Sequence, residues 1–294
     1  MPMYNLWSLV EPLLDAAEAK NVVEIGSFEA ENTRHLLHRA RRTKGIVHAV
    51  DPFPKFHTGD AEREYGPFIA IHQKKSLDVI PDLCPCDAVL IDGDHTWYTV
   101  INELRLLHKH SVLHGQMPLI LLHDVGWPYG RRDCYQIDED IPKEYRHPHA
   151  FKGLVMGQSY VTDVPWALHS NCDNALYEGG PHNGVLTAVE DFLKEIGSEW
   201  SFTDIPGFYG LGILLHEKTA RAFPALASLV KSLQLPIPLR EHLLSLERIR
   251  FSCYTEINRL EWELKNTSAQ EQSVCPPTPS EREIAAVAME QSGS

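Results

Sequence analysis

The feature that most constrains the fold is an alternation of short apolar runs with helical segments through the first half of the chain. The runs cover residues 21–25, 46–50, 68–71, 87–91 and 119–122. Most of the segments between them place apolar residues three or four apart, which is the spacing of one face of a helix. Strands that alternate with helices in this way predict a parallel sheet covered on both faces.

The second half departs from this pattern and then returns to it. Residues 125–184 are rich in Pro, Gly, His and aromatic side chains. This stretch is far longer than an ordinary connection and is typical of a functional insertion. A helix is predicted over 185–196, and two apolar runs follow at 200–205 and 209–215. Because only three residues separate these runs, they predict an antiparallel hairpin that ends a sheet of seven mostly parallel strands.

The pattern divides the chain into three parts. Residues 1–216 are predicted to form one α/β domain, in which 124–184 is the insertion. Residues 217–265 form a helical extension, whose apolar residues from Leu239 to Leu264 recur every three or four positions. That face either packs on its own domain or joins two copies into a homo-oligomer. Residues 266–294 are rich in Ser, Gln, Pro and Glu, which predicts a flexible tail.

Composition excludes several classes of protein. With 43% hydrophobic and 23% charged residues, the chain is neither collagen-like, wholly disordered nor membrane-embedded. The formal charge of -13 repels phosphate backbones and anionic lipid, so we expect no nucleic acid or membrane partner. The first twenty residues lack a basic leader and a cleavage site, and the six cysteines show no paired spacing. We therefore expect a cytoplasmic protein with reduced thiols.

Two strand ends indicate a ligand site. Gly26 follows the first strand, where a glycine lets a ligand approach the backbone, and Asp51 closes the second strand. A carboxylate at that place accepts hydrogen bonds from both hydroxyls of a ribose. The phosphate-binding patterns GxGxxG and GxxxxGK[ST] are missing, which favours a nucleoside without phosphate over NAD or ATP. Taken alone, these residues fit equally well a structural turn followed by a helix that Asn32 caps.

The residues from Glu24 to Thr33, which include VEIGS, resemble the first motif of class I S-adenosylmethionine-dependent methyltransferases. Asp51 and the IDGDH sequence of residues 91–95 occur in matching order. The nearest branch is that of small-molecule O-methyltransferases acting on sugars and natural products. The resemblance implies a Rossmann-like fold and methyl transfer from S-adenosylmethionine to a hydroxyl. One departure is Ala30, which stands where the family has its second glycine.

The resemblance also implies roles for individual residues in binding the cofactor. Asp51 would hold the ribose, Ser76 would lie beside the adenine, and Asp92 would lie near the methyl group. The residues that would flank the amino acid portion of the cofactor are Glu24, Gly26 and Ser27.

Some members of this family use a divalent metal, with one Asp after the fourth strand and an Asp-Asp or Asp-Asn pair after the fifth. Asp92, His123 and Asp124 stand at these places, and the implied ion is Mg²⁺ or another divalent metal that lowers the pKa of the acceptor hydroxyl. Histidine in the pair is a departure. It is consistent with a softer metal, or with a metal-free enzyme in which His123 is the base. His95 stands where the catechol-type enzymes carry a basic residue that takes the proton.

The insertion follows these candidate ligands directly, so its polar and aromatic residues are candidates for binding a small-molecule acceptor. Equally, they fit an exposed loop packed on the sheet edge. The candidates are Trp127, Tyr129, Arg131 and His182. Three other functions stay open: N-methylation, an NAD-dependent oxidoreductase, and a nucleoside-binding module without catalysis.

Overall fold

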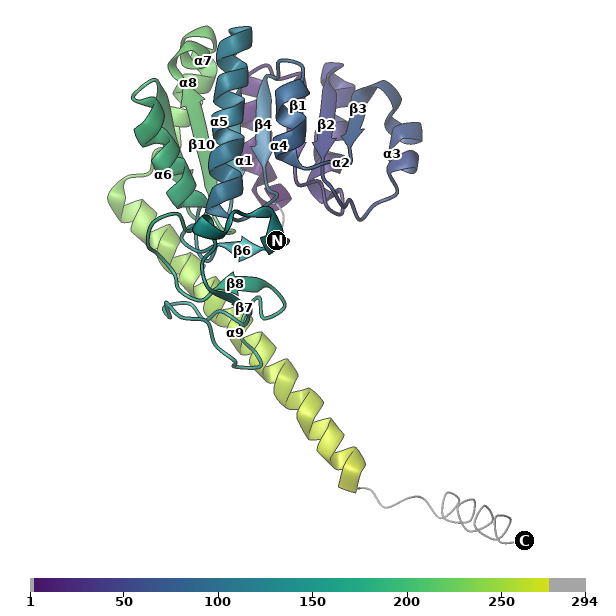
Figure 1. Cartoon of the computed structure of the whole chain (residues 1–294), viewed down its shortest axis with the longest axis vertical. Helices are drawn as coiled ribbons and strands as arrows, with labels where there is room; N and C mark the ends of the chain where they lie inside the picture. The colour runs from purple at the N-terminus through teal and green to yellow at the C-terminus, as the bar shows by residue number, and fades with distance from the viewer. Residues whose placement is uncertain (1–2, 275–294) are drawn as a thin grey trace, which may run out of the picture.

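A sheet of seven strands runs through the centre of the protein (Figure 1), whose computed structural model describes residues 3–274. In spatial order the sheet is β3-β2-β1-β4-β5-β10-β9, and β10 is antiparallel to both of its neighbours. The first five strands pair in parallel. The predicted α/β class with its terminal hairpin is therefore confirmed. The strands are β1 (Asn21–Ile25), β2 (Ile46–Val50), β3 (Ile69–His72), β4 (Ala88–Ile91), β5 (Leu119–His123), β9 (Trp200–Ile205) and β10 (Leu211–His216).

Helices cover both faces of this sheet, because the strands are apolar on both sides. In β4, Ala88 and Leu90 face one core, while Val89 and Ile91 face the other. Helices α1, α2 and α8 close the first core, and α4, α5 and α6 close the second. The helices are α1 (Trp7–Ala16), α2 (Glu31–Thr43), α3 (Thr58–Tyr65), α4 (Ser76–Val79), α5 (Trp97–His114), α6 (Val185–Ile196), α7 (Glu217–Ala222), α8 (Pro224–Ser232) and α9 (Ile237–Val274), with 3-10 turns at Met3–Leu6, Gly66–Phe68 and Ile80–Asp82.

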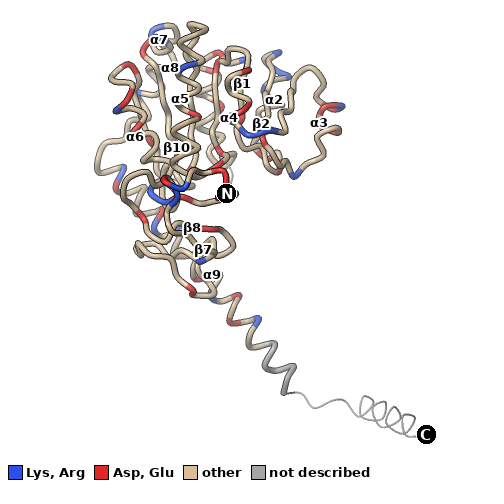
Figure 2. Tube along the Cα trace, viewed as in Figure 1, with Lys and Arg blue, Asp and Glu red and all other residues tan. Residues whose placement is uncertain are grey.

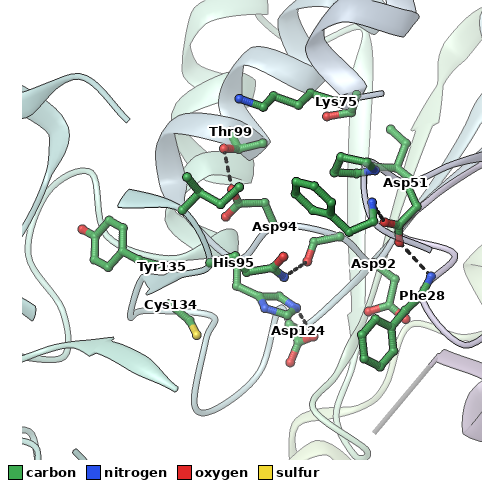
Figure 3. A pocket seen from close by; sticks show the side chains of 18 of the residues that line it. Phe28, Asp51, Lys75, Asp92, Asp94, His95, Thr99, Asp124, Cys134 and Tyr135 are labelled. Atoms are coloured by element: carbon green, nitrogen blue, oxygen red, sulfur yellow. Dashed lines mark hydrogen bonds and ion pairs between the residues drawn. The ribbon is translucent and has the colours of Figure 1, made fainter. Parts of the chain in front are cut away.

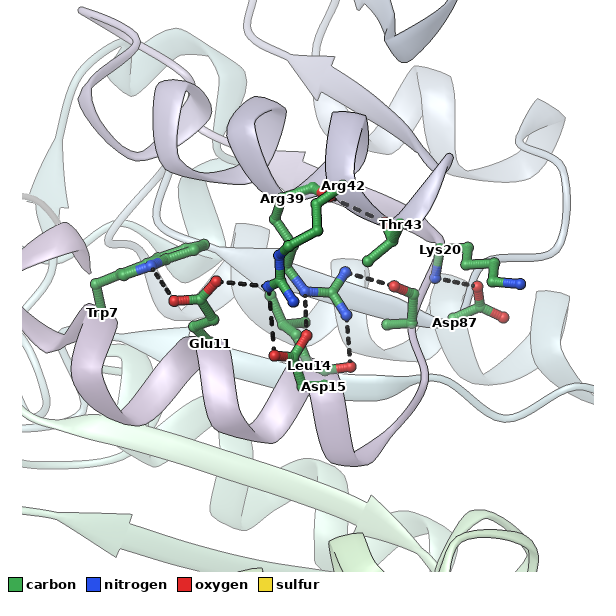
Figure 4. Close-up of polar contacts among 10 residues, drawn as sticks. Trp7, Glu11, Leu14, Asp15, Lys20, Arg39, Arg42, Thr43 and Asp87 are labelled. Atoms are coloured by element: carbon green, nitrogen blue, oxygen red, sulfur yellow. Dashed lines mark hydrogen bonds and ion pairs between the residues drawn. The ribbon is translucent and has the colours of Figure 1, made fainter.

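A buried guanidinium joins α1 to α2 on the first face (Figure 4). Arg39 is only 4% exposed, and its Nε donates to Asp15 Oδ1 at 2.9 Å. Its two terminal nitrogens donate to the carbonyls of Leu14 and Ala19, at and just beyond the end of α1. The Leu14 carbonyl also accepts from the Ala19 amide at 3.0 Å. Arg39 therefore adds charged hydrogen bonds at the carboxyl end of α1, where the helix dipole favours a cation.

The insertion forms a small sheet of its own below the carboxyl edge of the main sheet (Figure 1). Its strands lie in the order β6-β8-β7, and β8 is antiparallel to both of the others. This arrangement places the insertion against the strand ends that carry the candidate site. The elements are β6 (Cys134–Tyr135), β7 (His149–Phe151) and β8 (Asp173–Ala175), with 3-10 turns at Asp138–Asp140 and Lys143–Tyr145.

Helix α9 leaves the domain along a diagonal, with acidic and basic residues interspersed along its described part (Figure 2). Its first half packs on the domain through Phe251, which is fully buried against Trp127 and Tyr209. Further along, Ile257 and Leu260 are almost half exposed. The helix continues to Val274, past the predicted start of the tail at residue 266, and the remainder of that prediction, 275–294, lies outside the described residues.

The turn into α2 differs from the sequence prediction in its capping residue. Ala30 holds the N-cap position with a φ of 62°, while Asn32 lies inside the helix and donates to Glu24 Oε1 at 3.0 Å. Asn32 therefore does not cap the helix as predicted, because a buried carboxylate takes its amide. Ala30 has adopted the left-handed conformation that a second glycine would have adopted there without strain.

We expect Ala30→Gly to raise the free energy of unfolding by about 1 kcal/mol. The substitution relieves the left-handed strain on a residue with a Cβ, and the greater freedom of glycine in the unfolded chain offsets part of this gain. Urea unfolding followed by circular dichroism measures the change. A variant that is less stable than the wild type would show that the buried methyl group of Ala30 contributes more than the strain.

Candidate active site

The turn after β1 lies against the end of β4. Gly26 has a φ of +91°, and a Cβ built on it would lie 2.1 Å from the backbone oxygen of Asp92. The Gly26 amide donates to Val50 O at 2.9 Å, and the Asp92 amide donates to Ile25 O at 2.9 Å. Only glycine fits this place, so the ends of three adjacent strands are held together at one edge of the sheet.

Asp51 organises the neighbouring loops (Figure 3). Its Oδ2 accepts from the backbone amide of Phe28 at 2.8 Å, and its Oδ1 accepts from the amide of Phe53 at 2.7 Å. Each carboxylate oxygen has a further lone pair. Asp51 thus fixes the turn that follows Gly26 while keeping the capacity to accept hydrogen bonds from a ligand.

A cavity of about 1030 Å³ opens over these strand ends. Its walls come from the ends of β1, β2, β4 and β5, the start of α4, one face of α5, and the insertion. Six of the eleven buried side-chain atoms that lack a hydrogen-bond partner in the described chain belong to residues on these walls. Buried polar groups are normally satisfied, so this concentration indicates a site built for a polar ligand. The six residues are Ser27, Asn32, His95, Glu103, Tyr129 and Asp173.

His123 lies behind the cavity with both ring nitrogens occupied. Its Nε2 contacts the carbonyl oxygen of Phe208 at 2.8 Å, and its Nδ1 lies 3.0 Å from Asp92 Oδ1 and 2.9 Å from Asp124 Oδ2. A carbonyl only accepts, so Nε2 carries a proton, and two carboxylates favour a second proton on Nδ1. The ring therefore has no lone pair for a metal, and the prediction of His123 as a ligand or base does not fit this geometry.

The histidine that lies beside Asp92 and Asp124 as a candidate metal ligand is His95, whereas the sequence suggested His123. One ligand atom each from Asp92, His95 and Asp124 lie within 4.8 Å of one another, facing the cavity. The Nε2 of His95 is 2.9 Å from Asp124 Oδ2, yet this buried nitrogen lacks hydrogen-bond geometry with any partner. Because His95 and Asp124 are close but do not form a well-oriented hydrogen bond, both side chains could bind the same ion. The residues present therefore fit a divalent metal.

Burial and neighbouring charges shift the pKa values of His123 and Asp124 in opposite directions. Burial alone would lower the pKa of His123, but the charges of Asp92 and Asp124 outweigh it and hold that pKa well above its usual value. Burial would raise the pKa of Asp124, but His123 and His95 outweigh it and hold that pKa well below the usual range. At neutral pH the buried pair is an imidazolium and a carboxylate. Asp124 also has a φ of 58°, a strained conformation that is common at functional sites.

Most residues predicted for the cofactor do lie on the cavity walls. Glu24 is the exception, because its side chain is fully buried and does not reach the cavity wall. It accepts hydrogen bonds from Thr33 Oγ1 at 2.6 Å and from the amide of Asn32 at 3.0 Å, and so fixes the first turn of α2. The predicted residues that line the cavity are Gly26, Ser27, Asp51, Ser76 and Asp92.

Of the four residues predicted to bind the acceptor, only Tyr129 lines the cavity. Trp127 packs edge-on against Phe251 of α9. Arg131 forms a two-point ion pair with Glu190 of α6, with distances of 2.7 and 2.6 Å. His182 packs on the indole of Trp97, with ring centroids 4.1 Å apart. The partners of these three side chains lie on α9, α6 and α5, far from them in the chain, so the local sequence does not reveal them.

Other residues of the cavity wall gave no signal in the sequence. Glu103 lies in the middle of α5, where a polar residue at helical spacing gives no signal of its burial. Cys134 and Cys172 come together with Tyr129 in a small apolar cluster of the insertion, although 38 positions separate them in the chain. The neighbouring His169 and Asp173 also line the cavity. Only the pairing of β6 with β8 brings these residues together.

The buried carboxyl group of Glu24 makes stability depend on pH. Burial raises the pKa of Glu24 from 4.5 to about 8, so the folded protein keeps its proton between these values while the unfolded chain loses it. The free energy of unfolding is therefore expected to fall as pH rises from about 4.5 to 8. Glu24→Gln, which retains both polar positions, should flatten this fall in urea unfolding at several pH values. Equal slopes for the variant, the wild type and the exposed control Glu195→Gln would contradict the assignment.

This strand order, with β10 as the single antiparallel strand of the sheet, is the Rossmann-like methyltransferase fold that the sequence predicted. Residues 23–125 match a family model described as a methyltransferase domain. This part of the chain is therefore a methyltransferase domain. None of the curated proteins matches the chain.

The solved structures that match the chain come from several organisms. The SAH-bound methyltransferase PaMTH1 of Podospora anserina has 12% identity and a TM-score of 0.44, covering 70% of this chain and 76% of its own. A Burkholderia thailandensis 1,6-didemethyltoxoflavin-N1-methyltransferase with bound S-adenosylhomocysteine has 11% identity and a TM-score of 0.37, covering 72% and 81%. Human N-acetylserotonin methyltransferase in complex with SAM has 13% identity and a TM-score of 0.38, covering 72% and 52%.

Proposed function

We propose that the protein transfers a methyl group from S-adenosylmethionine to a hydroxyl of a small molecule, with the help of a divalent metal. The observation that carries this proposal is that Asp92, His95 and Asp124 converge in the same cavity as Gly26 and Asp51. One end of the cavity is thus suited to a nucleoside, and the other to a hydroxyl that must lose its proton.

A divalent ion, when bound, would act as a Lewis acid that lowers the pKa of the acceptor hydroxyl. Asp92, His95 and Asp124 would hold it. The nitrogen ligand favours Mn²⁺ or Zn²⁺ relative to Mg²⁺, which prefers oxygen ligands alone. His123 neutralises part of the charge of Asp92 and Asp124 and fixes the direction of both carboxylates. Methyl transfer itself needs in-line positioning, which the walls of the cavity supply.

The insertion supplies the wall that an acceptor would contact. The Tyr129 ring stacks on the imidazole of His95, with centroids 5.0 Å apart and planes 13° from parallel. Phe151 is 71% exposed and also lines the cavity, while Asp173 Oδ1 is buried without a partner. Aromatic faces next to hydrogen-bonding groups suit a sugar or another polyhydroxylated natural product. We therefore propose that the protein acts in the biosynthesis of such compounds.

A second candidate is metal-free O- or N-methylation with His95 as the base. The 2.9 Å contact between His95 Nε2 and Asp124 Oδ2 favours it, because an adjacent carboxylate makes an imidazole more basic. Burial lowers the pKa of His95, but the charge of Asp124 outweighs it and raises the net value. On this model the rate would rise with pH until His95 is neutral.

Two measurements test the proposal. Titration calorimetry should detect binding of S-adenosylmethionine and none of NAD; the reverse result would favour an oxidoreductase. Cell extracts and a panel of sugars and phenols are then incubated with the protein and methyl-labelled cofactor, and mass spectrometry identifies the labelled product. EDTA should stop the reaction and Mn²⁺ should restore it. Cofactor binding without any labelled product would favour a binding module, and activity unaffected by EDTA would favour the His95 model.

Three further expectations remain predictions. A homo-oligomer through α9 would cover apolar side chains that are exposed in the described part of that helix, such as Leu260 and Leu264. Sedimentation of the wild type beside Leu260→Glu tests it. The excess of acidic residues supports the absence of a nucleic acid partner. We found no helix in residues 3–274 that could span a membrane, and the cytoplasmic location is still to be tested.

A further inference from the structure

Glu103 is fully buried, yet it forms part of the cavity wall. Ser76 Oγ donates to its Oε1 at 2.5 Å, while Oε2 has no hydrogen-bond partner. Thr99, one turn earlier on the same face of α5, already donates to Asp94 Oδ2 at 3.0 Å. A buried polar atom without a partner costs about 1–3 kcal/mol. A hydrogen-bonding group in the cavity would therefore complete the arrangement by bonding to Oε2.

The setting of Glu103 favours the neutral form of its carboxyl group. It accepts one hydroxyl hydrogen bond, and no Lys or Arg pairs with it in the part of the chain that the structure describes. Burial raises the pKa of Glu103 to about 8. The hydrogen bond from Ser76 opposes this shift, as does the charge of His95, while the charge of Asp94 adds to it. In the neutral form, with Ser76 donating to Oε1, the acid proton is on Oε2. Glu103 therefore presents a hydrogen-bond donor to the cavity.

The partnerless atoms divide the cavity into three regions. Ser27 lies in the turn after β1, and Asn32 lies in the first turn of α2. Tyr129 and Asp173 lie on the insertion, and His95 stacks on Tyr129. Glu103 lies between α5 and the start of α4. S-adenosylmethionine also has three parts. Its methyl must face the acceptor and hence the insertion, and its amino acid portion suits the open turn at Gly26. The adenine of the cofactor is then left to occupy the region around Glu103.

We infer that Oε2 of Glu103 donates a hydrogen bond to N1 of the cofactor's adenine, and that Glu103 thereby selects the base. The inference rests on the proposed function, since it requires an adenosyl cofactor in the cavity. Ser76 is a positioning residue, because its hydrogen bond to Oε1 keeps the proton on Oε2. A ring that lacks an acceptor at this position would leave the donor buried and unsatisfied.

Titration calorimetry with S-adenosylhomocysteine and with its 1-deaza analogue tests the inference. The analogue has a carbon in place of N1 and keeps the 6-amino group. The wild type should bind it ten- to a hundred-fold more weakly. Equal affinity for the two ligands would overturn the inference, and this comparison needs no variant. Failure of the wild type to bind S-adenosylhomocysteine at all would instead overturn the proposed function.

Two substitutions extend the test. In Glu103→Gln, Ser76 still donates to Oε1 and the amide nitrogen donates where the acid did, so the preference for S-adenosylhomocysteine over the analogue should persist. Glu103→Leu should bind both ligands with equal, reduced affinity. A preference that persists in Glu103→Leu, or that disappears in Glu103→Gln, would overturn the inference. Thermal melting checks that each variant is folded. The control is Glu195→Leu on the exposed side of α6, which should bind both ligands with the affinities of the wild type.

Discussion

Asp124→Asn is expected to lower the rate of methyl transfer about a thousand-fold while leaving the cofactor bound. The amide is a poorer ligand than the carboxylate, and a Lewis acid that stabilises the reacting oxygen by several kcal/mol accounts for a loss of this size. Titration with Mn²⁺ gives a second reading that needs no acceptor, since the variant should bind the ion far more weakly than the wild type. Affinity for S-adenosylhomocysteine should change little, because Gly26 and Asp51 are untouched.

The control for this substitution is Asp163→Asn, the same change at a carboxylate that is 78% exposed and paired with Lys152. It should match the wild type in rate, Mn²⁺ affinity and cofactor affinity. If Asp124→Asn bound Mn²⁺ as tightly as the wild type does, Asp124 would not be a ligand. If neither protein bound the ion while the rate still fell, Asp124 would act by making His95 more basic.

The same variant should be less stable, by about 3 kcal/mol, because it leaves buried imidazoles without their carboxylate. The sign of the pH dependence follows from the two pKa shifts. The contribution of His123, whose pKa is raised, is fully present below its ordinary 6.5 and is lost as pH rises through the raised value. The contribution of Asp124, whose pKa is lowered, is present above 3.8 and is lost as pH falls through the lowered value. The stability difference should therefore be largest between these limits.

Sequence alone located the strand ends well, because strands buried on both faces leave continuous apolar runs whose last residues are easy to identify. Gly26, Asp51 and Asp92 all follow such runs, and all three line one cavity. The prediction of His123 as a ligand failed because the choice between two nearby histidines depends on a distant segment. The carbonyl of Phe208, 85 residues further along the chain, occupies Nε2 of His123.

The insertion was the least predictable part for the same reason. Its strands are only two or three residues long, and its shape depends on α6 and α9, which follow it in the chain. Nothing near Arg131 in the sequence indicates that it pairs with Glu190. Glu103 shows the opposite failure: the pattern correctly predicts its helix but does not distinguish a buried polar residue from an exposed one.

Gly26→Ala is expected to be the most damaging single substitution for the fold and the cofactor site together. The new Cβ would lie 2.1 Å from Asp92 O and 2.6 Å from Gly93 Cα, so the ends of β1 and β4 would have to separate. Backbone strain at a φ of +91° adds to this clash. We expect the free energy of unfolding to fall by about 3–5 kcal/mol. We also expect affinity for S-adenosylhomocysteine to fall about a hundred-fold, because the turn and Asp92 move apart.

Gly180→Ala separates the two causes. Gly180 has a φ of +88°, but a Cβ there would have nothing within 4 Å, so this variant carries the strain without the clash. Its free energy of unfolding, measured with urea, should be about 1–2 kcal/mol lower than that of the wild type, and its affinity for S-adenosylhomocysteine should be unchanged. Equal destabilisation of both variants would mean that the backbone conformation alone makes Gly26 necessary. Cofactor affinity that survives Gly26→Ala would mean that the ligand does not depend on the contact between β1 and β4, and the active site would have to be sought elsewhere in the cavity.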